Sequence, residues 1–576
     1  MKTDHLLAFA AGVSLALTPT AATPALPAAM SASMAHPEDG IHPNVRCRTD
    51  DRGHEVMMMA SAPPPSPPPP PAPPPPVMAS PSRMAPADMA MTSPRPQVLQ
   101  YEPVRDTERY EGEEVSDVMR VADSPVSTFS ADVDTASYSN ARRFLMDGNM
   151  PPSASVRTEE FLNYFRYDYP LPENRLQPFS VSLDSAITPW NIDTHLMRVG
   201  IRGYDLPRAD RPVANLTFLI DVSGSMSSGD KIDLVRYSLK QLAERLRPDD
   251  RVSIVVYAGA SGLVLEPTAD KDAVHAALDC MRAGGSTAGA AGLELAYQTA
   301  RSSFVEGGIN RVILATDGDF NVGITQDDRL TDFIEAQRDS GITLTVLGYG
   351  RGNLNDSMME KLTNAGNGNY GYVDSKMEAD KILGQELSST LFTIAGDVKF
   401  QVEFNPAVIA EYRLIGYENR ALAEEDFDND AVDAGDIGAG HQVTALYEVV
   451  LVGREGWLPE RRYGEASPRT PDWGAEAAYV KLRYKLPGED ESRLLQQPLM
   501  ASELRAAAVP VGDFAFQAAV AAFGQKLRGD EMLARFSYGH IRGLAGSQRG
   551  ADPWRQQFVE LVALASDQGS MPDGAK

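Results

Sequence analysis

The chain has 576 residues, of which 43% are hydrophobic, enough for two or three domains with a sizeable core. It carries 79 Asp and Glu against 53 Lys and Arg, a formal net charge of -26. Such an acidic chain repels nucleic acid and anionic membranes at long range, and no basic stripe offsets the repulsion. We therefore expect no nucleic-acid partner.

Residues 1–30 resemble a secretory signal peptide. Lys2 is followed by an apolar run over residues 6–17 and then by small residues and prolines. The run is short for a permanent membrane anchor, and no lipobox cysteine follows it. The alternative is a disordered, alanine-rich leader. We expect export to the periplasm, the cell envelope or the extracellular space, with no permanent transmembrane segment after cleavage.

Residues 31–100 are predicted to be a disordered, proline-rich linker, in which residues 63–76 form a polyproline II spacer about 43 Å long. The chain has two cysteines, Cys47 in this linker and Cys280 in the central part. A disulfide between them would suit an oxidising compartment, but their placement does not favour the pairing.

Residues 101–211 are predicted to form a flanking region of helices followed by strands. Helical spacing of apolar residues is seen over residues 127–148 and 157–169. Strict alternation then begins at Phe179 and recurs from Met197, which is typical of half-buried antiparallel strands.

Residues 212–396 change to an α/β pattern. Apolar strands are expected at 216–220, 252–257, 312–315 and 342–347, separated by helical segments, of which the first has an apolar stripe from Ile232 to Leu246. Strands that alternate with helices predict a doubly wound, mainly parallel sheet covered on both faces. Such sheets place ligand sites at the carboxyl ends of their strands.

Residues 397–500 return to alternation, for example from Val398, Val443 and Val480. We expect a β-rich module that is built from both flanks of the α/β domain, so that the domain is an insertion in it. Residues 501–576 are predicted to be helical, with Phe516 and Phe523 on a core-facing stripe.

Three polar loops follow strand or helix ends in the α/β part. The first has oxygen-bearing side chains at alternate positions, Asp221, Ser223 and Ser225; the second, at 283–292, holds Thr287 among glycines; the third begins at Asp317. Burying such groups is costly unless hydrogen bonds or a cation satisfy them. If the sheet is doubly wound, these side chains converge at one edge.

This arrangement resembles a von Willebrand factor type A (VWA) domain with a complete metal-ion-dependent adhesion site, whose pattern is Asp-x-Ser-x-Ser, a separate Thr and a separate Asp-Gly. The resemblance implies that Asp221, Ser223, Ser225, Thr287 and Asp317 bind Mg²⁺, or Mn²⁺ or Ca²⁺, with the carboxylates often acting through waters. It also implies that an Asp or Glu carboxylate of a protein partner completes the coordination. The flanks resemble those of a bacterial subfamily of VWA proteins.

The sequence thus predicts an exported, non-enzymatic protein-binding module. The alternative is a structural envelope or assembly factor in which the metal only orders the loops. A metal-dependent hydrolase is not favoured, because the sequence has no nucleophile elbow, Walker loop, Rossmann fingerprint or zinc-binding HExxH motif. Met226 and Phe320, beside the loops, would either line the rim of the site or pack locally.

Overall fold

The computed structural model describes residues 47–49, 55–57, 107–207, 209–286, 289–318, 327–386, 389, 391–459, 461 and 470–569. The expected signal peptide and most of the expected linker lie outside these ranges. Inside the linker, β1 (Cys47–Thr49) pairs antiparallel with β2 (Glu55–Met57), a short hairpin where the sequence predicts disorder.

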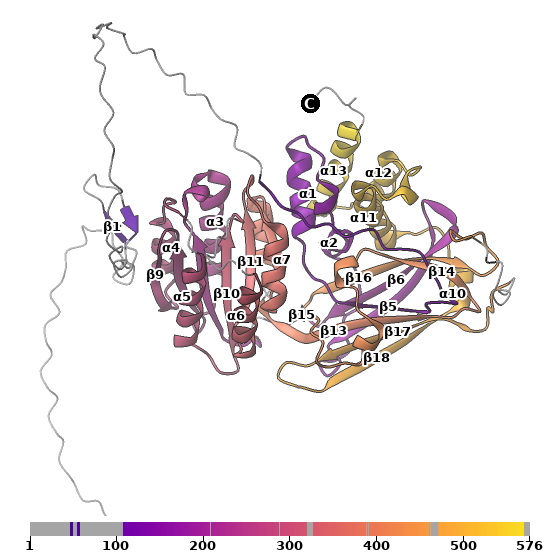
Figure 1. Cartoon of the computed structure of the whole chain (residues 1–576), viewed down its shortest axis with the longest axis horizontal. Helices are drawn as coiled ribbons and strands as arrows, with labels where there is room; N and C mark the ends of the chain where they lie inside the picture. Colours follow the sequence, from indigo (N-terminus) through magenta and orange to yellow (C-terminus); the bar gives the residue numbers. More distant parts are fainter. Residues whose placement is uncertain are drawn as a thin grey trace, which may run out of the picture. The chain divides into compact units, whose positions relative to one another are not determined.

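A six-stranded sheet forms the centre of the α/β part (Figure 1). In spatial order its strands are β12 (Tyr370–Val373), β11 (Thr343–Tyr349), β10 (Ile309–Thr316), β7 (Ala214–Asp221), β8 (Arg251–Tyr257) and β9 (Ser261–Thr268). All neighbouring pairs are parallel except β8 and β9. The sequence pattern predicts β7, β8, β10 and β11 but not the edge strands β9 and β12.

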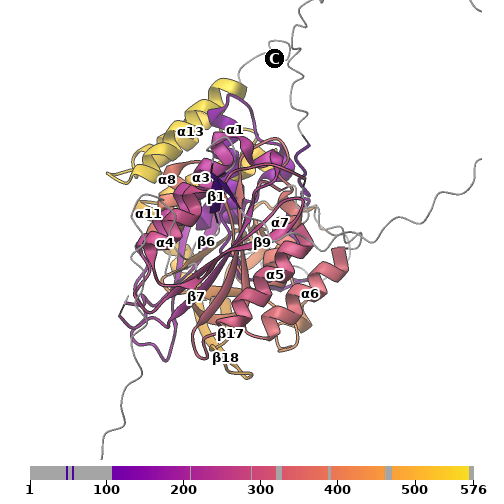
Figure 2. The ribbon, with the colours of Figure 1, turned by 90° about the vertical axis from the view of Figure 1, so that its left-hand side faces the viewer.

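Helices cover both faces of this sheet, with α3 and α4 on one side and α5 and α6 on the other (Figure 2). The helices of this part that the structure describes are α3 (Leu234–Glu244), α4 (Lys271–Asp279), α5 (Gly289–Ser302), α6 (Asp327–Asp339), α7 (Asp356–Ala365) and α8 (Lys376–Asp380). Side chains of β7 alternate between the faces: Phe218 shares a core with Val235 of α3, and Leu219 shares one with Leu293 of α5. The predicted doubly wound α/β fold is thereby confirmed.

The β-rich module consists of two five-stranded sheets. The first contains β15 (Gly435–Gly438), β13 (Thr393–Phe404), β17 (Glu476–Lys485), β18 (Ser492–Met500) and β4 (Val126–Ser130). The second contains β3 (Met119–Arg120), β14 (Ile409–Ile415), β16 (Gln442–Leu451), β6 (Asn191–Gly203) and β5 (Phe179–Thr188). Because β4 pairs with β13 and β6 pairs with β16, strands from both flanks of the α/β domain share each sheet, as predicted.

One local prediction in the first flank is wrong. Helical spacing is expected from residue 127, but the chain there is strand β4, and helix α1 (Ala136–Met146) begins only at Ala136. Phe129 of β4 is fully buried and stacks on Phe400 of β13 with ring centroids 4.9 Å apart. Pairing and packing across the sheet therefore override the local helical spacing.

A helical layer packs together residues from the two ends of the described chain (Figure 1). It contains α1, α2 (Thr158–Asn163), α11 (Gly512–Arg528), α12 (Tyr538–Gly546) and α13 (Pro553–Gly569), whereas α10 (Ala501–Ala506) packs on β5, β17 and β18 of the β-rich module. As predicted, Phe516 and Phe523 of α11 face a core, which they share with Phe161 and Phe558. No helix within the described ranges combines the length and hydropathy needed to cross a bilayer.

Short helical turns complete the fold. They are η1 (Ser153–Ser155), η2 (Gly224–Ser227), η3 (Gly229–Asp233), η4 (Lys381–Gln385), η5 (Glu418–Arg420), η6 (Glu424–Asp426) and η7 (Glu531–Leu533). Of these, η2 and η3 connect β7 to α3 and so shape the carboxyl edge of the central sheet.

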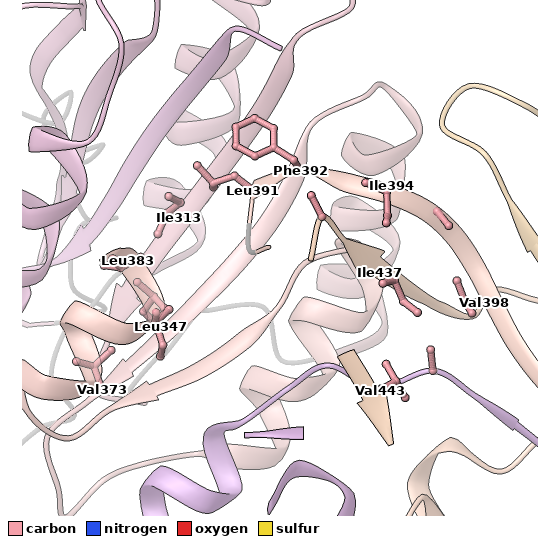
Figure 3. Close-up of a cluster of buried hydrophobic side chains, with 14 of the residues drawn as sticks. Ile313, Leu347, Val373, Leu383, Leu391, Phe392, Ile394, Val398, Ile437 and Val443 are labelled. Atoms are coloured by element: carbon pink, nitrogen blue, oxygen red, sulfur yellow. The ribbon is translucent and has the colours of Figure 1, made fainter. Parts of the chain in front are cut away.

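One hydrophobic core runs from the central sheet into the β-rich module (Figure 3). Leu347 of β11 belongs to it, as do Val398 of β13 and Val443 of β16. Phe392 and Ile394 lie between these groups in Figure 3 and are 2% exposed. The α/β domain is therefore joined to its flanks by continuous apolar packing and not only by its two chain connections.

Cys280, which follows α4, is buried and disulfide-bonded. The sequence leaves a disulfide open without favouring it. The side chain of Cys47, the other cysteine of the sequence, lies outside the described residues.

Candidate metal centre

Two of the expected metal ligands lie at the carboxyl ends of neighbouring strands. Asp221 is the last residue of β7, and Asp317 directly follows β10. The two strands pair in parallel, with Ile220 opposite Ala315, so both carboxylates are brought to the same edge of the sheet. Both side chains are fully buried, and their charges influence each other.

The two serines follow Asp221 within a tight loop. The Ser223 and Ser225 hydroxyl oxygens are 2.9 Å apart, and the Ser223 backbone N–H donates to Asp221 Oδ1 at 2.8 Å. Alternate residues of the motif thus present their oxygens together at the start of η2. The structure brings Asp221, Ser223, Ser225 and Asp317 to one place, whereas Thr287 lies outside the described residues.

The Asp221 carboxylate is oriented by the ends of three adjacent strands. In addition to the Ser223 N–H, it accepts hydrogen bonds on Oδ2 from the Tyr257 hydroxyl at the end of β8 and the Thr316 hydroxyl at the end of β10, at 3.1 and 3.4 Å. Burial raises the pKa of Tyr257 well above its usual range, so the phenol stays protonated as a donor. These neighbours hold the carboxylate in one orientation before any ligand arrives.

Hydrogen bonds only partly compensate the charge of Asp221. Burial raises its pKa to about 6; the Ser223 hydrogen bonds oppose the shift, and the nearby Asp317 charge adds to it. A buried carboxylate with a raised pKa is a group whose charged form lacks stabilisation. A cation at this position would supply the missing stabilisation of the Asp221 charge.

The rim of the site is open to solvent. The Gly224 N–H donates to the Gly285 carbonyl at 2.9 Å, and the Gly284 N–H donates to the Val222 carbonyl at 2.8 Å, which joins the first two loops. Gly224, Gly284 and Gly285 are exposed, and Ser225 is half-buried. Met226, in contrast, is fully buried in the core, so local packing explains it; Phe320 lies outside the described residues.

Lys231 is a residue of the site that no sequence motif singled out, and its ammonium donates to Asp317 Oδ2 and to Asn353 Oδ1, each at 2.9 Å. Lys231 belongs to η3 and is 6% exposed. A signal was present: Lys231 precedes the core residue Val235 by four positions, so it continues the apolar stripe of the helix. A lysine on a buried stripe indicates a buried carboxylate partner.

The donor set fits a hard divalent cation. Two carboxylates and two hydroxyls offer only oxygen atoms, which Mg²⁺, Mn²⁺ and Ca²⁺ prefer. In the part of the chain that the structure describes, no three His, Cys, Asp or Glu side chains gather so that they could hold a metal ion, so this donor set depends on its hydroxyls as well as its carboxylates. Asp317 already forms an ion pair with the Lys231 ammonium, so this buried carboxylate is stabilised by a positive charge.

The Gly318→Ala substitution is expected to disrupt the Asp317 loop. Gly318 has φ +99°, and an added Cβ would lie 2.5 Å from the Asn355 nitrogen and 2.7 Å from the Asn353 carbonyl. We expect the free energy of unfolding to fall by about 2–4 kcal/mol, from backbone strain and the clash together.

Gly307→Ala is the matched control, because Gly307 also has positive φ (+68°) but no atom within 4 Å of the added Cβ. It should cost about 1 kcal/mol. Urea unfolding of both variants measures the difference, and equal losses would show that the close approach at Gly318 does not constrain the loop.

Three family models match consecutive parts of the chain. The von Willebrand factor type A domain model matches residues 215–385, a model described as von Willebrand factor matches residues 104–198, and the model of the C-terminal part of uncharacterized protein YfbK matches residues 389–567. The first spans the central sheet and its helices; the other two span the flanks.

Relatives agree with this assignment. The chain is 45% identical to "Uncharacterized protein YfbK" of Escherichia coli (strain K12) over 470 residues, which cover 80% of this chain and 81% of that protein. The solved structure "von Willebrand factor type A from Catenulispora acidiphila" covers 69% of this chain and 91% of its own, at 15% identity and a TM-score of 0.37. On the strength of the 45% identity to the Escherichia coli relative, the chain belongs to the YfbK-like family of bacterial proteins that contain a von Willebrand factor type A domain.

Proposed function

We propose that this protein captures a protein partner through a divalent cation held by Asp221, Ser223, Ser225, Thr287 and Asp317. The observation that carries the proposal is the placement of a buried, pre-oriented carboxylate next to two hydroxyls, 2.9 Å apart, at a solvent-open edge. A VWA domain in a bacterial protein is a protein-interaction module, which gives the general class of function.

Each group has a distinct task in this proposal. Ser223, Ser225 and Thr287 offer neutral hydroxyl oxygens, while Asp221 and Asp317 supply the negative charge, directly or through water. When bound, Mg²⁺, or Mn²⁺ or Ca²⁺ in its place, acts as an electrophile that accepts an Asp or Glu carboxylate of the partner. The exposed glycines around the loops leave room for the partner to approach.

A purely structural role for the cation is less well supported. The first two loops are already joined by the backbone hydrogen bonds of Gly224 and Gly284, and Asp317 is already paired with Lys231. The loops therefore have their own ties without an ion. If the cation is not needed to order the loops, its role is better explained by the binding of a partner carboxylate.

Hydrolysis is also less well supported, because a metal-dependent hydrolase needs a general base or nucleophile at the ion. None of the histidines that the structure describes lies in the loops of the candidate site: His195 is on β6, His275 on α4 and His540 on α12, and His441 precedes β16. We infer a non-enzymatic module. The leader-like residues 1–30 support export to the periplasm, the cell envelope or the extracellular space.

Cation binding is expected to weaken at acid pH, because protons compete for Asp221. With the pKa of Asp221 at about 6, Mg²⁺ affinity should be constant above about pH 7 and fall by about tenfold per unit below pH 6. Calorimetric titrations with Mg²⁺ from pH 5 to pH 8 measure this dependence. An affinity that does not change over this range would exclude Asp221 as a charged ligand.

The proposal is tested by partner capture from an envelope extract. The immobilised full chain is compared with the Asp221→Ala/Asp317→Ala double variant, each with Mg²⁺ and with EDTA, after circular dichroism has shown both to be folded. A protein retained only by the wild type with Mg²⁺ supports the proposal and identifies the partner. Equal retention in all four samples would leave the cation no role in capture.

A further inference from the structure

Lys231 is held rigidly beside the candidate cation site. Its side chain is 8% exposed, and that of its partner Asp317 is fully buried. The methylene stem passes over Gly350, where an added Cβ would lie 2.2 Å from Cγ and 2.4 Å from Cε of the lysine. Gly350, just after β11, has φ +71°, so glycine at this position permits both the turn and the passage of the stem.

The ammonium is aimed at the site by two acceptors on different strand ends. Asp317 follows β10 and Asn353 lies in the loop after β11, and each accepts from Nζ at 2.9 Å. The nearby Arg351 does not share this role: it is 54% exposed and pairs with Asp147 and Asp230 at the surface. Lys231 therefore places a positive charge on Asp317, and the Asp317 charge in turn acts on Asp221.

The charges at the site depend on this lysine. Asp221, Asp317 and Lys231 together carry one net negative charge, so a bound divalent cation leaves one net positive charge. Without the lysine, the loaded site would be neutral. A buried charge a few ångströms away changes ion affinity strongly, because screening by water is weak there.

We propose that Lys231 is a built-in counter-cation of the site, an inference that rests on the function proposed above. It weakens the binding of the divalent cation and keeps the loaded site net positive, so that the loaded site selects an anionic carboxylate over a neutral oxygen ligand. It also neutralises Asp317 while no divalent cation is bound. Lys231 is thus a charge-setting residue that acts through Asp317 and contacts no partner itself.

Lys231→Met in the full chain tests the first part of this inference, because methionine keeps an unbranched stem over Gly350 and removes the charge. We expect Mg²⁺, titrated calorimetrically, to bind about 10- to 100-fold more tightly than to the wild type. The melting temperature without Mg²⁺ should fall, and its rise on adding Mg²⁺ should be larger than in the wild type. Equal or weaker Mg²⁺ binding would overturn the inference.

Two further variants test whether the change in Mg²⁺ affinity comes from the charge at position 231. Lys240→Met removes a lysine of α3 that pairs with Asp279 at the surface, and it should leave Mg²⁺ affinity unchanged. Lys231→Gln keeps a hydrogen-bond donor toward Asp317 without the charge, and it should tighten Mg²⁺ binding like the methionine variant. If Lys231→Met fails to fold, Lys231→Gln carries the test.

Acetate, as a simple carboxylate, tests the second part. In Mn²⁺-loaded protein, the relaxation enhancement of water protons falls as acetate displaces bound water. The acetate concentration for half the effect should be about tenfold higher in Lys231→Met than in the wild type. An equal or lower concentration would overturn the inference alone, whereas a wild type that binds no Mn²⁺ would overturn the proposed function as well.

Discussion

Replacing Asp221 by alanine is expected to lower the Mg²⁺ affinity by at least about 100-fold, since even residues that only orient ligands commonly contribute 10- to 100-fold. The physical reason is that Asp221 supplies negative charge at a fixed position, held by Ser223, Tyr257 and Thr316. Its pKa of about 6 shows that these donors leave its charge incompletely stabilised, so a cation gains from it directly.

Calorimetric titration with Mg²⁺ at pH 7.5 measures the loss. Glu294→Ala is the control, because it removes one carboxylate from an exposed position of α5 and should leave the affinity unchanged. Circular dichroism establishes that both variants are folded. A folded Asp221→Ala variant that binds Mg²⁺ as tightly as the wild type would show that the cation binds elsewhere.

The Arg142→Ala variant is expected to lose about 3–5 kcal/mol of unfolding free energy, because it leaves buried carboxylates without a counter-charge. Arg142 lies on α1, is 1% exposed, and donates to Asp374 Oδ2 and Glu378 Oε2, each at 2.7 Å. It also donates to the Tyr164 hydroxyl at 2.7 Å. The two carboxylates follow β12 at the edge of the central sheet, so this cluster joins the first flank to the α/β domain.

Chemical unfolding in urea measures this loss. Arg351→Ala is a suitable control, because Arg351 is 54% exposed and its pairing with Asp147 at 2.6 Å should contribute less than about 1 kcal/mol. If Arg142→Ala were no less stable than Arg351→Ala, the buried cluster would not be a link between the flank and the domain.

The central fold could be predicted because its physical causes are local in the sequence. A strand buried on both faces, such as β7, is a continuous apolar run, and the helix after it has a regular apolar stripe. The insertion of the domain in a β-rich module was also predictable, since alternation resumes at Val398. Strand β4 was not predictable. Phe129 is buried by β13, some 270 residues later in the chain, whereas the residues next to Phe129 in the sequence have helical spacing.

In the candidate site, too, features with a local cause in the sequence could be predicted and those with a distant cause could not. Asp221, Ser223, Ser225 and Asp317 are recognisable because motif spacing and strand ends bring them together. Lys231 was missed because its role depends on Gly350, which leaves room for the stem, and on the distance from Nζ to Asp317. Neither of these appears in a local pattern, and Thr287 remains a prediction.

Anomalous diffraction from crystals of the full chain grown with Mn²⁺ would show where the cation binds. We expect one Mn²⁺ next to the Ser223 and Ser225 hydroxyls and the Asp221 and Asp317 carboxylates, with at least one coordination position held by exchangeable water. That open position is where a partner carboxylate would bind. No Mn²⁺ at this edge, or an ion enclosed entirely by protein ligands, would contradict cation-mediated capture.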